Sequence, residues 1–401
     1  MSVPLDRLYH YLDDCVNHDL LIYGWSTHGS RNLDNLIPWL DYSQYEFLHH
    51  APIICHDQEP LNFLFYSQQQ LKQRARKICL IWQFDDWITD PILDYMANQN
   101  LRGAMQIANQ FDLTMLLHSE LNSVQVDRYA QNGFVPVYYW AHAVIAQDWF
   151  RYAEHDPELH FDLSNIKQDF LVYNRAWSGT REYRLYFADQ LVNQDMLDHV
   201  QIKFNPVDEQ HYTQHIFKNK SLQITNFTLE QHLSINSVDA AASADYVGKD
   251  YASTAIEVVL ETLFDDSRWH LTEKTLRPIA CGKPFILAAT SGSLQYLRDY
   301  GFETFADVID ESYDTITDSK HRLDAIVAEM KRIAALDAGA KQVLYAKLHA
   351  IAQRNKQRFF NGMVEQVIDE YKTNLNQAMA IMQQHCTGRY RTAIRQLLQQ
   401  N

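Results

Sequence analysis

The chain has 401 residues, of which 46% are hydrophobic, 12% are aromatic and 21% are charged. This composition can bury a large core, it excludes a disordered or collagen-like chain, and the length favours two domains. The 35 basic and 50 acidic residues give a net charge of −15, which disfavours a protein that coats polyanions.

The sequence favours a cytoplasmic location. No stretch approaches the roughly 18 consecutive apolar residues of a membrane span. The first residues, MSVPLDRLYHYLDDC, lack the cationic flank and apolar core of a secretory signal. The five cysteines are scattered without a CxxC pair, which is typical of a reducing compartment and argues against a cysteine zinc site or a disulfide scaffold.

Short β-branched or aromatic segments alternate with longer amphipathic segments through the first half of the chain. The predicted strands are Leu20–Trp25, Pro52–Cys55, Ile78–Trp82, Leu113–Leu117 and Val135–Tyr139. Strands that alternate with helices are typical of a parallel, doubly wound sheet. Residues 1–150 are therefore expected to form a Rossmann-like domain.

The second half repeats this alternation after a packed hinge at Trp140–Asp162. Its predicted strands are Phe170–Tyr173, Val200–Phe204, Leu222–Thr225, Ile256–Leu260 and Phe285–Ala288. The predicted helices between and after them are Arg181–Val192, Thr228–Leu233 and Ser293–Tyr300. Residues 160–312 are expected to form a second Rossmann-like domain, with a ligand cleft between the two.

No strand is predicted after about residue 313. The spacing of Leu323, Ile326, Val327, Met330 and Ile333 predicts a helix with one apolar face. A second, longer helical segment runs from about residue 344 and is expected to break at Gly388. The predicted fold class is thus α/β, with two Rossmann-like domains and C-terminal helices, residues 313–401, that pack across their junction.

The end of the chain is basic, although the whole chain is acidic. From Lys341 onward there are nine basic and three acidic residues, which gives this tail a charge of +6. One interpretation is a solvated helix face, and the other is a positive strip beside a site for an anionic substrate.

The segment RWHLTEKTLRPIACGKPF, before the strand PFILAA, carries the strongest chemical signal. Thr272 can cap a helix whose first turn holds Glu273 and Lys274, although Pro278 either kinks this helix or moves its start to Thr275. Free N–H groups at a helix start suit a phosphate, and Lys274 adds a charge for a diphosphate. Glu273 can accept hydrogen bonds from two ribose hydroxyls. The alternative is a capped helix with a surface Glu–Lys pair.

Further polar residues follow the ends of predicted strands, where parallel sheets bind ligands. The strand FLVYN ends at Asn174 and is followed by Arg175, whose planar fork suits a diphosphate. Arg181 and Arg184 come next, and the alternative for them is one helix face paired with acids. The strand IEVVLET ends at Glu261 and Thr262.

The segment WHLTEKTLRPIACGKPFIL resembles the donor-binding motif of the fucosyltransferase family. More broadly, the pattern is similar to nucleotide-sugar glycosyltransferases with two Rossmann-like domains, the GT-B fold. The segments FLVYNRAWSGTREYR and TSGSLQYLRDYGFETFADVIDESYD also resemble uncharacterised glycosyltransferases of bacteriophages. This resemblance covers residues 168–315, while the N-terminal half matches only in layout.

The resemblance implies that Glu273 holds the nucleotide ribose, and that Lys274 and Arg175 hold the diphosphate. It further implies an inverting, metal-independent transfer, with a nucleotide-sugar as co-substrate and no other cofactor. The sequence independently favours the absence of a metal, because it contains no D-x-D pair to hold a cation. The charge of the leaving group would then be met by Arg, Lys and helix N-termini.

The N-terminal half should supply the base that takes the proton from the acceptor hydroxyl. The strand APIIC is followed by HDQEP, which places Asp57 and Glu59 at the ligand edge, with Asp57 preferred. For Asp57 the alternative is a helix cap, and His28 is the next candidate base. The residues His118, Ser119 and Glu120 could shape the acceptor pocket, and Trp140 and His142 could stack on a sugar or pack in the core.

The acceptor is left open by the sequence, as are the sugar, the nucleotide and the oligomeric state. A glycan, a small hydroxylated metabolite, a protein side chain and a hydroxymethylated DNA base all fit a hydroxyl acceptor. Phage resemblance favours DNA, whereas the charge of −15 opposes it unless the basic tail lines the groove. The sequence has no GxGxxG, GxxxxGK[ST], GxSxG or HExxH motif. The alternative to an enzyme is a non-catalytic nucleotide- or sugar-binding protein.

Overall fold

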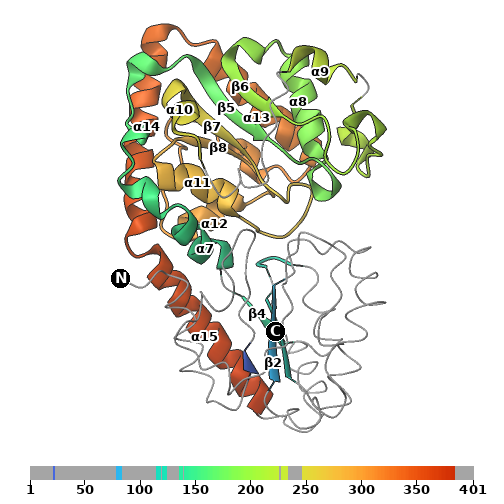
Figure 1. The fold of residues 1–401 in the computed structure, drawn as a ribbon, viewed down its shortest axis with the longest axis vertical. Helices are drawn as coiled ribbons and strands as arrows, with labels where there is room; N and C mark the ends of the chain where they lie inside the picture. Colours follow the sequence, from blue (N-terminus) through green and yellow to red (C-terminus); the bar gives the residue numbers. More distant parts are fainter. Residues whose placement is uncertain are drawn as a thin grey trace. The chain divides into compact units, whose positions relative to one another are not determined.

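The computed structural model describes residues 21–22, 78–83, 114–118, 120–123, 135–138, 140–224, 227–233 and 246–383. The chain divides into two compact units, Met1–Ala141 with Glu365–Asn401, and His142–Val364. The described residues of each unit form a parallel four-stranded sheet (Figure 1). The predicted α/β class is therefore confirmed, while the acceptor and donor roles of the two halves stay predictions.

The first sheet has the strand order β1-β2-β3-β4, and every neighbouring pair is parallel. Its strands are β1 (Leu21–Ile22), β2 (Ile78–Gln83), β3 (Thr114–His118) and β4 (Val135–Val137). Four strands predicted in the first half overlap these elements, and the fifth, Pro52–Cys55, lies outside the described residues. Part of helix α15 (Met363–Gln383) belongs to this unit, where the Asn374 side-chain amide donates to the Tyr138 carbonyl at 2.8 Å.

The second sheet has the order β6-β5-β7-β8 and is also parallel throughout. Its strands are β5 (Gln168–Asn174), β6 (Val200–Phe204), β7 (Thr254–Leu260) and β8 (Phe285–Ala288). Every residue of β7 is buried, as expected for a central strand that is covered on both faces. The predictions for β6 and β8 agree with the structure at both ends.

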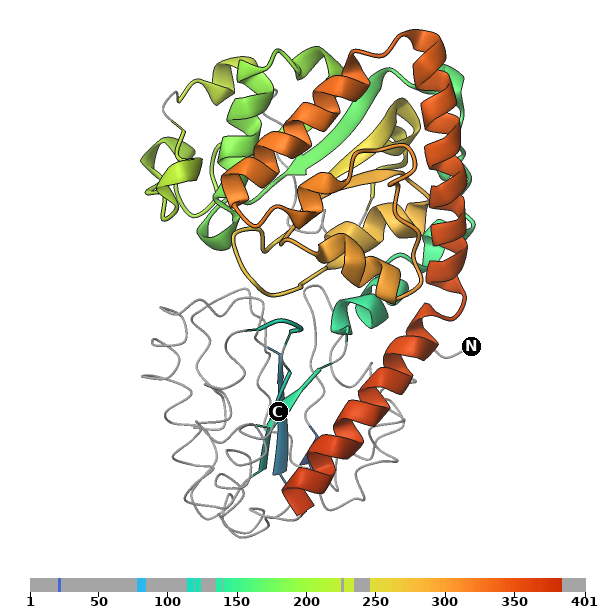
Figure 2. The same cartoon turned by 180° about the vertical axis from the view of Figure 1, so that it is seen from behind.

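Nine helices of the described residues have the following bounds. They are α7 (Ala141–Trp149), α8 (Tyr183–Asn193), α9 (Leu229–His232), α10 (Gly248–Ser253), α11 (Glu273–Cys281), α12 (Ser293–Asp299), α13 (Ser319–Ala334), α14 (Ala338–Phe360) and α15. Helix α11 lies on one face of the second sheet, and α13 lies on the other, packed against α8 and β8 (Figures 1 and 2). Among these helices, none is both long and apolar enough to cross a membrane.

The connections of the second sheet run in opposite directions from its two central strands. Strand β5 continues through α8 to β6, on one side, and β7 continues through α11 to β8, on the other. Crossovers of the same hand then place α8 and α11 on opposite faces. The gap between the carboxyl ends of β5 and β7 is therefore a topological switch point, where open parallel sheets bind their ligands.

Two predictions about local structure are wrong. The described part of the predicted strand Leu222–Thr225, residues 222–224, is instead the end of a 3₁₀ helix, Lys220–Leu222, and the loop after it. Asn219 caps this 3₁₀ helix, and its side chain accepts from the Ser221 N–H at 3.0 Å. Its alternating Leu222 and Ile224 are both buried, so a loop against the core produced the strand-like pattern. The predicted break at Gly388 lies outside the described residues, and the C-terminal segment, which was expected to be continuous up to that point, breaks at Gly362, between α14 and α15. There φ is +90°, a conformation that glycine adopts without steric cost.

Candidate active site at the carboxyl edge of the second sheet

Helix α11 begins where the sequence predicted it. Thr272 is the N-cap, and its Oγ1 accepts from the Lys274 N–H at 3.3 Å. The alternative start at Thr275 is wrong, and Pro278 lies inside the helix. Gly282 ends the helix with φ of +67°, in agreement with its role as a stop signal. Glu273 and Lys274 therefore occupy the first turn, just beyond the edge of the sheet.

The carboxylate of Glu261, directly after β7, fixes this helix start. It is fully buried and accepts five hydrogen bonds of 2.5 to 3.2 Å from three threonines. The donors are the backbone N–H of Thr262, the N–H and hydroxyl of Thr272, and the N–H and hydroxyl of Thr275. Burial alone raises the pKa of Glu261, yet the charge of Lys274 and these bonds outweigh it and lower the pKa. Glu261 is thus a buried anchor, and the predicted direct contact with a donor does not fit its burial.

These contacts occupy the N–H groups at the start of α11. Glu261 accepts from the N–H groups of Thr272 and Thr275, and the Thr272 hydroxyl accepts from the N–H of Lys274. The N–H groups of Lys274 and Thr275 are therefore engaged internally, and phosphate binding at this helix start stays a prediction. Two carboxylates, Glu261 and Glu273, already satisfy the positive end of the helix.

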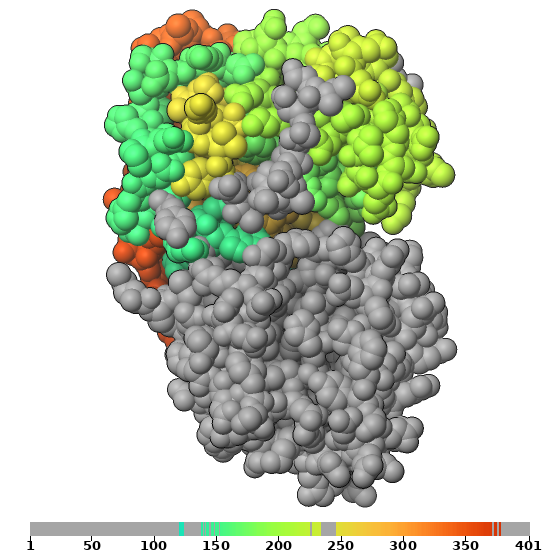
Figure 3. All heavy atoms as spheres, in the orientation of Figure 1, coloured from blue at the N-terminus to red at the C-terminus, as the bar shows by residue number. Residues whose placement is uncertain are grey.

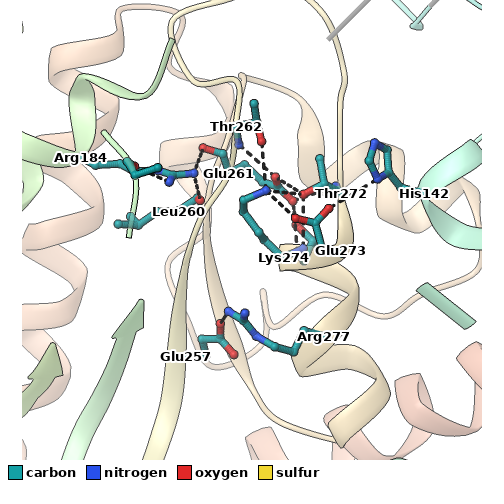
Figure 4. A network of polar contacts seen from close by, with 12 residues as sticks. His142, Arg184, Glu257, Leu260, Glu261, Thr262, Thr272, Glu273, Lys274 and Arg277 are labelled. Carbon is teal, nitrogen blue, oxygen red and sulfur yellow. Dashed lines mark hydrogen bonds and ion pairs between the residues drawn. The ribbon is translucent and has the colours of Figure 1, made fainter. Parts of the chain in front are cut away.

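Glu273 and Lys274 form a partly buried pair at the switch point (Figure 4). The Lys274 ammonium donates to Glu273 Oε1 at 2.8 Å, to Thr262 Oγ1 at 3.1 Å and to Thr272 Oγ1 at 3.2 Å. The side chains are 20% and 10% exposed for Lys274 and Glu273. This exposure is lower than that of a solvated surface pair but leaves the ammonium within reach of a ligand.

His142 is a neighbour of Glu273 to which the sequence assigned only stacking or core packing. Its Nδ1 lies 3.5 Å from Glu273 Oε2, and its ring packs edge-on against His270 at 4.9 Å between centroids. Burial raises the pKa of Glu273, but the charges of Lys274 and His142 outweigh it and hold that pKa well below its usual range. No motif marks His142, because only the fold brings the start of α7 to α11.

The residues that follow β5 divide into buried and accessible ones. Asn174 is fully buried and donates to the Arg184 carbonyl at 3.0 Å, while its Oδ1 has no hydrogen-bond partner among the described residues. Arg184 is buried and donates to the carbonyls of Ala176, Leu260 and Glu261 at 2.6 to 2.9 Å. Arg184 is therefore structural, paired with carbonyls where the sequence suggested acids. Arg175 and Arg181 are partly exposed.

A threonine links the carboxyl ends of β5 and β7. The hydroxyl of Thr180, in the turn between β5 and α8, donates to the Thr262 carbonyl at 3.1 Å. The hydroxyl of the same Thr262 accepts from Lys274. The structure thus brings the Arg175–Arg181 turn next to the Glu273–Lys274 pair, as the strand-end argument predicted.

The predicted base candidates Asp57, Glu59 and His28 lie outside the described residues, as does Ser119. Glu120 is buried. Within the described ranges, no group of three or more His, Cys, Asp or Glu side chains is placed to hold a metal ion.

Comparisons with known proteins give little further identification. No protein-family model matches the chain, and no curated protein matches it. Among solved structures, the crystal structure of α,α-trehalose 6-phosphate synthase from Burkholderia multivorans is similar over 77% of this chain and 70% of that chain. Its sequence identity is 12% and its TM-score is 0.36, which is too low to support a conclusion about fold or function.

The basic residues of α14 are largely engaged within the second unit. Lys341 pairs with Asp169 at 2.7 Å, and Arg354 pairs with Glu303 at 2.6 Å. Lys356 and Arg358 donate to backbone carbonyls at 2.6 and 2.9 Å. This part of the tail is therefore not a free positive strip.

Proposed function

We propose that this chain is a glycosyltransferase that takes its sugar from a nucleotide-diphosphate sugar bound at the carboxyl edge of the second sheet. One observation carries the proposal. The buried Glu261 anchors the start of α11 so that the Glu273 carboxylate and the Lys274 ammonium lie side by side at the β5–β7 switch point. A carboxylate beside an ammonium suits the ribose and diphosphate parts of such a donor.

In the proposed complex, Lys274 exchanges part of its contacts for a diphosphate oxygen, and Glu273 accepts from the ribose hydroxyls. Arg175 adds a planar cation that can bond two phosphate oxygens. These groups would stabilise the negative charge that develops on the leaving diphosphate, which is where electrostatic catalysis acts. The proposal includes inversion at the anomeric carbon of the sugar without a metal ion. Lys274 and Arg175 would then neutralise the charge of the leaving diphosphate.

The acceptor hydroxyl would lose its proton to Asp57, Glu59 or His28 in the first half of the chain. A glycan or a small hydroxylated molecule suits the acceptor better than DNA. A duplex would need several free cations for its phosphates, and four cations of α14 are already paired with acids or carbonyls.

A donor screen tests the proposal. Thermal-shift measurements with UDP, GDP, TDP and ADP sugars should identify one nucleotide that raises the melting temperature, because a ligand that binds only the native state stabilises it. A CMP sugar, which has a single phosphate, serves as the control. With that donor, the release or transfer of the sugar should continue in EDTA. Binding without turnover or hydrolysis would instead favour a non-catalytic binding protein, and the absence of any nucleotide effect would contradict the proposal.

A further inference from the structure

The occupied start of α11 raises the question of where a diphosphate finds its hydrogen-bond donors. The described contacts leave the cluster of Glu261, Glu273 and Lys274 with two carboxylates and one ammonium. Such a cluster can bind hydroxyl groups, but it is poorly suited to hold a dianion by itself. A second group of donors is therefore needed near the switch point.

The turn between β5 and α8 offers such donors. The backbone N–H groups of Trp177 and Ser178 converge on a single oxygen, Oδ2 of Asp208, at 2.9 and 2.8 Å. Successive N–H groups that point at one oxygen form a nest, which is a common way for a protein to bind an anion. In this structure the anion is an internal carboxylate.

The surroundings of this nest favour negative charge. Burial raises the pKa of Asp208, but the hydrogen bonds from Ser178 and Trp177 and the charge of Arg181 outweigh it, so the pKa is lowered. Gly179 follows the nest with φ of +63°, and no atom lies within 4 Å of the place where its Cβ would be. The turn thus combines anion-binding donors with open space.

The turn also lies beside the proposed ribose site. Thr180 bonds the Thr262 carbonyl, and the Thr262 hydroxyl bonds Lys274. A nucleoside diphosphate whose ribose meets Glu273 could therefore extend its phosphates past Lys274 and Thr262 toward the nest.

Asp208 belongs to a segment that can leave the nest. It lies between β6 and α9, in a part of the chain that covers one side of the second unit in the space-filling view (Figure 3). The neighbouring Val207 is 56% exposed, and Glu209 is exposed as well. Besides the two nest bonds, the Ser178 hydroxyl donates to Glu209 Oε1 at 3.3 Å. Two further bonds, from the Asp208 N–H to the Gln210 carbonyl and from the Tyr212 N–H to the Pro206 carbonyl, lie within the segment itself. An exposed segment of this kind can open locally at low cost.

We infer that the Trp177–Ser178 nest is a phosphate subsite of the donor, and that Asp208 occupies this subsite until the donor's phosphate displaces it. The inference rests on the proposed function. It assigns Asp208 as an internal competitor of the donor and adds the β5–α8 turn to the binding machinery. The nucleoside part alone would not need this displacement.

Calorimetry with Asp208→Asn and Asp208→Ala tests the inference. The control for the loss of one negative charge is Asp198→Ala, because Asp198 is exposed on the same unit, whereas the nearer Glu209 accepts from the Ser178 hydroxyl at 3.3 Å. If Asp208 occupies the nest in about 90% of molecules, its removal should tighten nucleoside diphosphate binding about tenfold. Binding of the unphosphorylated nucleoside should not change, and Asp198→Ala should stay within about twofold of the wild type.

Wild-type or weaker diphosphate affinity in both Asp208 variants, with nucleoside binding intact, would overturn the inference. If these variants lose nucleoside binding because they misfold, hydrogen exchange in the wild-type protein decides. Residues 205–211 should exchange faster with nucleoside diphosphate than with nucleoside, and equal exchange rates would contradict displacement. If the wild-type protein binds no nucleotide at all, the proposed function itself is contradicted. This outcome differs from those above, in which the protein binds nucleotide but Asp208 is not displaced.

Discussion

Helix α11 carries two ion pairs that differ in how much water they meet. Near its start, Lys274 pairs with Glu273, and these side chains are 20% and 10% exposed. Less than one turn later, Arg277 pairs with Glu257 of β7 at 2.5 Å, and these side chains are only 4% and 1% exposed. Figure 4 shows the two pairs lying apart, on the same helix.

The second pair belongs to a sealed polar network. Arg277 also bonds the Tyr251 hydroxyl at 3.2 Å, Tyr251 bonds Glu257, and the guanidinium lies 4.6 Å from the centre of the Tyr173 ring. Every charge there has a fixed partner and no ligand can reach it. Residue type and spacing do not distinguish the Arg277–Glu257 pair from the Lys274–Glu273 pair. The difference is burial, which makes the first pair structural and leaves the second accessible to a ligand.

The sealed pair should give the largest stability effect. Replacing Arg277 by Met leaves Glu257 buried without its partner, and breaking a buried ion pair costs about 3–5 kcal/mol. Urea unfolding measures this loss of unfolding free energy. The folded fraction of Arg277→Met should still bind nucleotide, and a loss of stability below about 1 kcal/mol would show that the pair is not sealed.

A second interior cation predicts a dependence of stability on pH. Lys283 is buried and donates to the carbonyls of Tyr251 and Thr254, and burial lowers its pKa to about 7. Between pH 7 and about 10.4 the unfolded chain then binds more protons than the folded one, so stability should rise with pH by a few kcal/mol. Unfolding free energies of wild type and Lys283→Met, compared over this range, measure the effect. A wild-type pH dependence that the substitution leaves unchanged would contradict it.

The accessible pair should affect binding as well as stability. Lys274→Ala should weaken nucleoside diphosphate binding by about 1.5–3 kcal/mol, the size of a hydrogen bond to a charged group. It should also lower the melting temperature, because the charge of Lys274 holds down the pKa values of the buried Glu261 and Glu273 carboxylates. Calorimetry measures the affinity. Lys320→Ala is the control, because Lys320 also pairs with a carboxylate, Asp324, but on α13. Equal losses of affinity in Lys274→Ala and Lys320→Ala would contradict the assignment of Lys274 to the binding site.

The exposed limit of the comparison is the pair of Arg354 and Glu303 on the surface. These side chains are 52% and 50% exposed. Arg354→Met should therefore leave the unfolding free energy nearly unchanged. A loss as large as that of Arg277→Met would mean that burial does not set the size of these effects.

Much of the fold could be predicted because apolar patterns and turn residues agree locally. Val200–Phe204 and Phe285–Ala288 are short buried strands bounded by polar or turn residues, and their predicted ends match the structure. Two residues explain the wrong predictions. The side chain of Asn219 caps a 3₁₀ helix within an apolar pattern that resembles a strand, and Gly362, with its positive φ, interrupts a helical pattern.

The candidate site was less predictable, because its residues act through contacts distant in sequence. Thr272, Glu273 and Lys274 could be identified from their local spacing. Whether Glu261 meets a ligand or anchors a helix depends on burial, which a strand-end position does not reveal. The approach of His142 to Glu273 joins residues 131 positions apart, and only the folded chain brings them together.

The most direct test of the account is a crystal structure of the wild-type chain with the nucleoside diphosphate that the thermal-shift screen selects. The account predicts the ribose hydroxyls within hydrogen-bond distance of Glu273, with the diphosphate bonded to Lys274 beside the β5–α8 turn. A nucleotide bound elsewhere, with the Lys274–Glu273 pair and the five bonds of Glu261 unchanged, would contradict it.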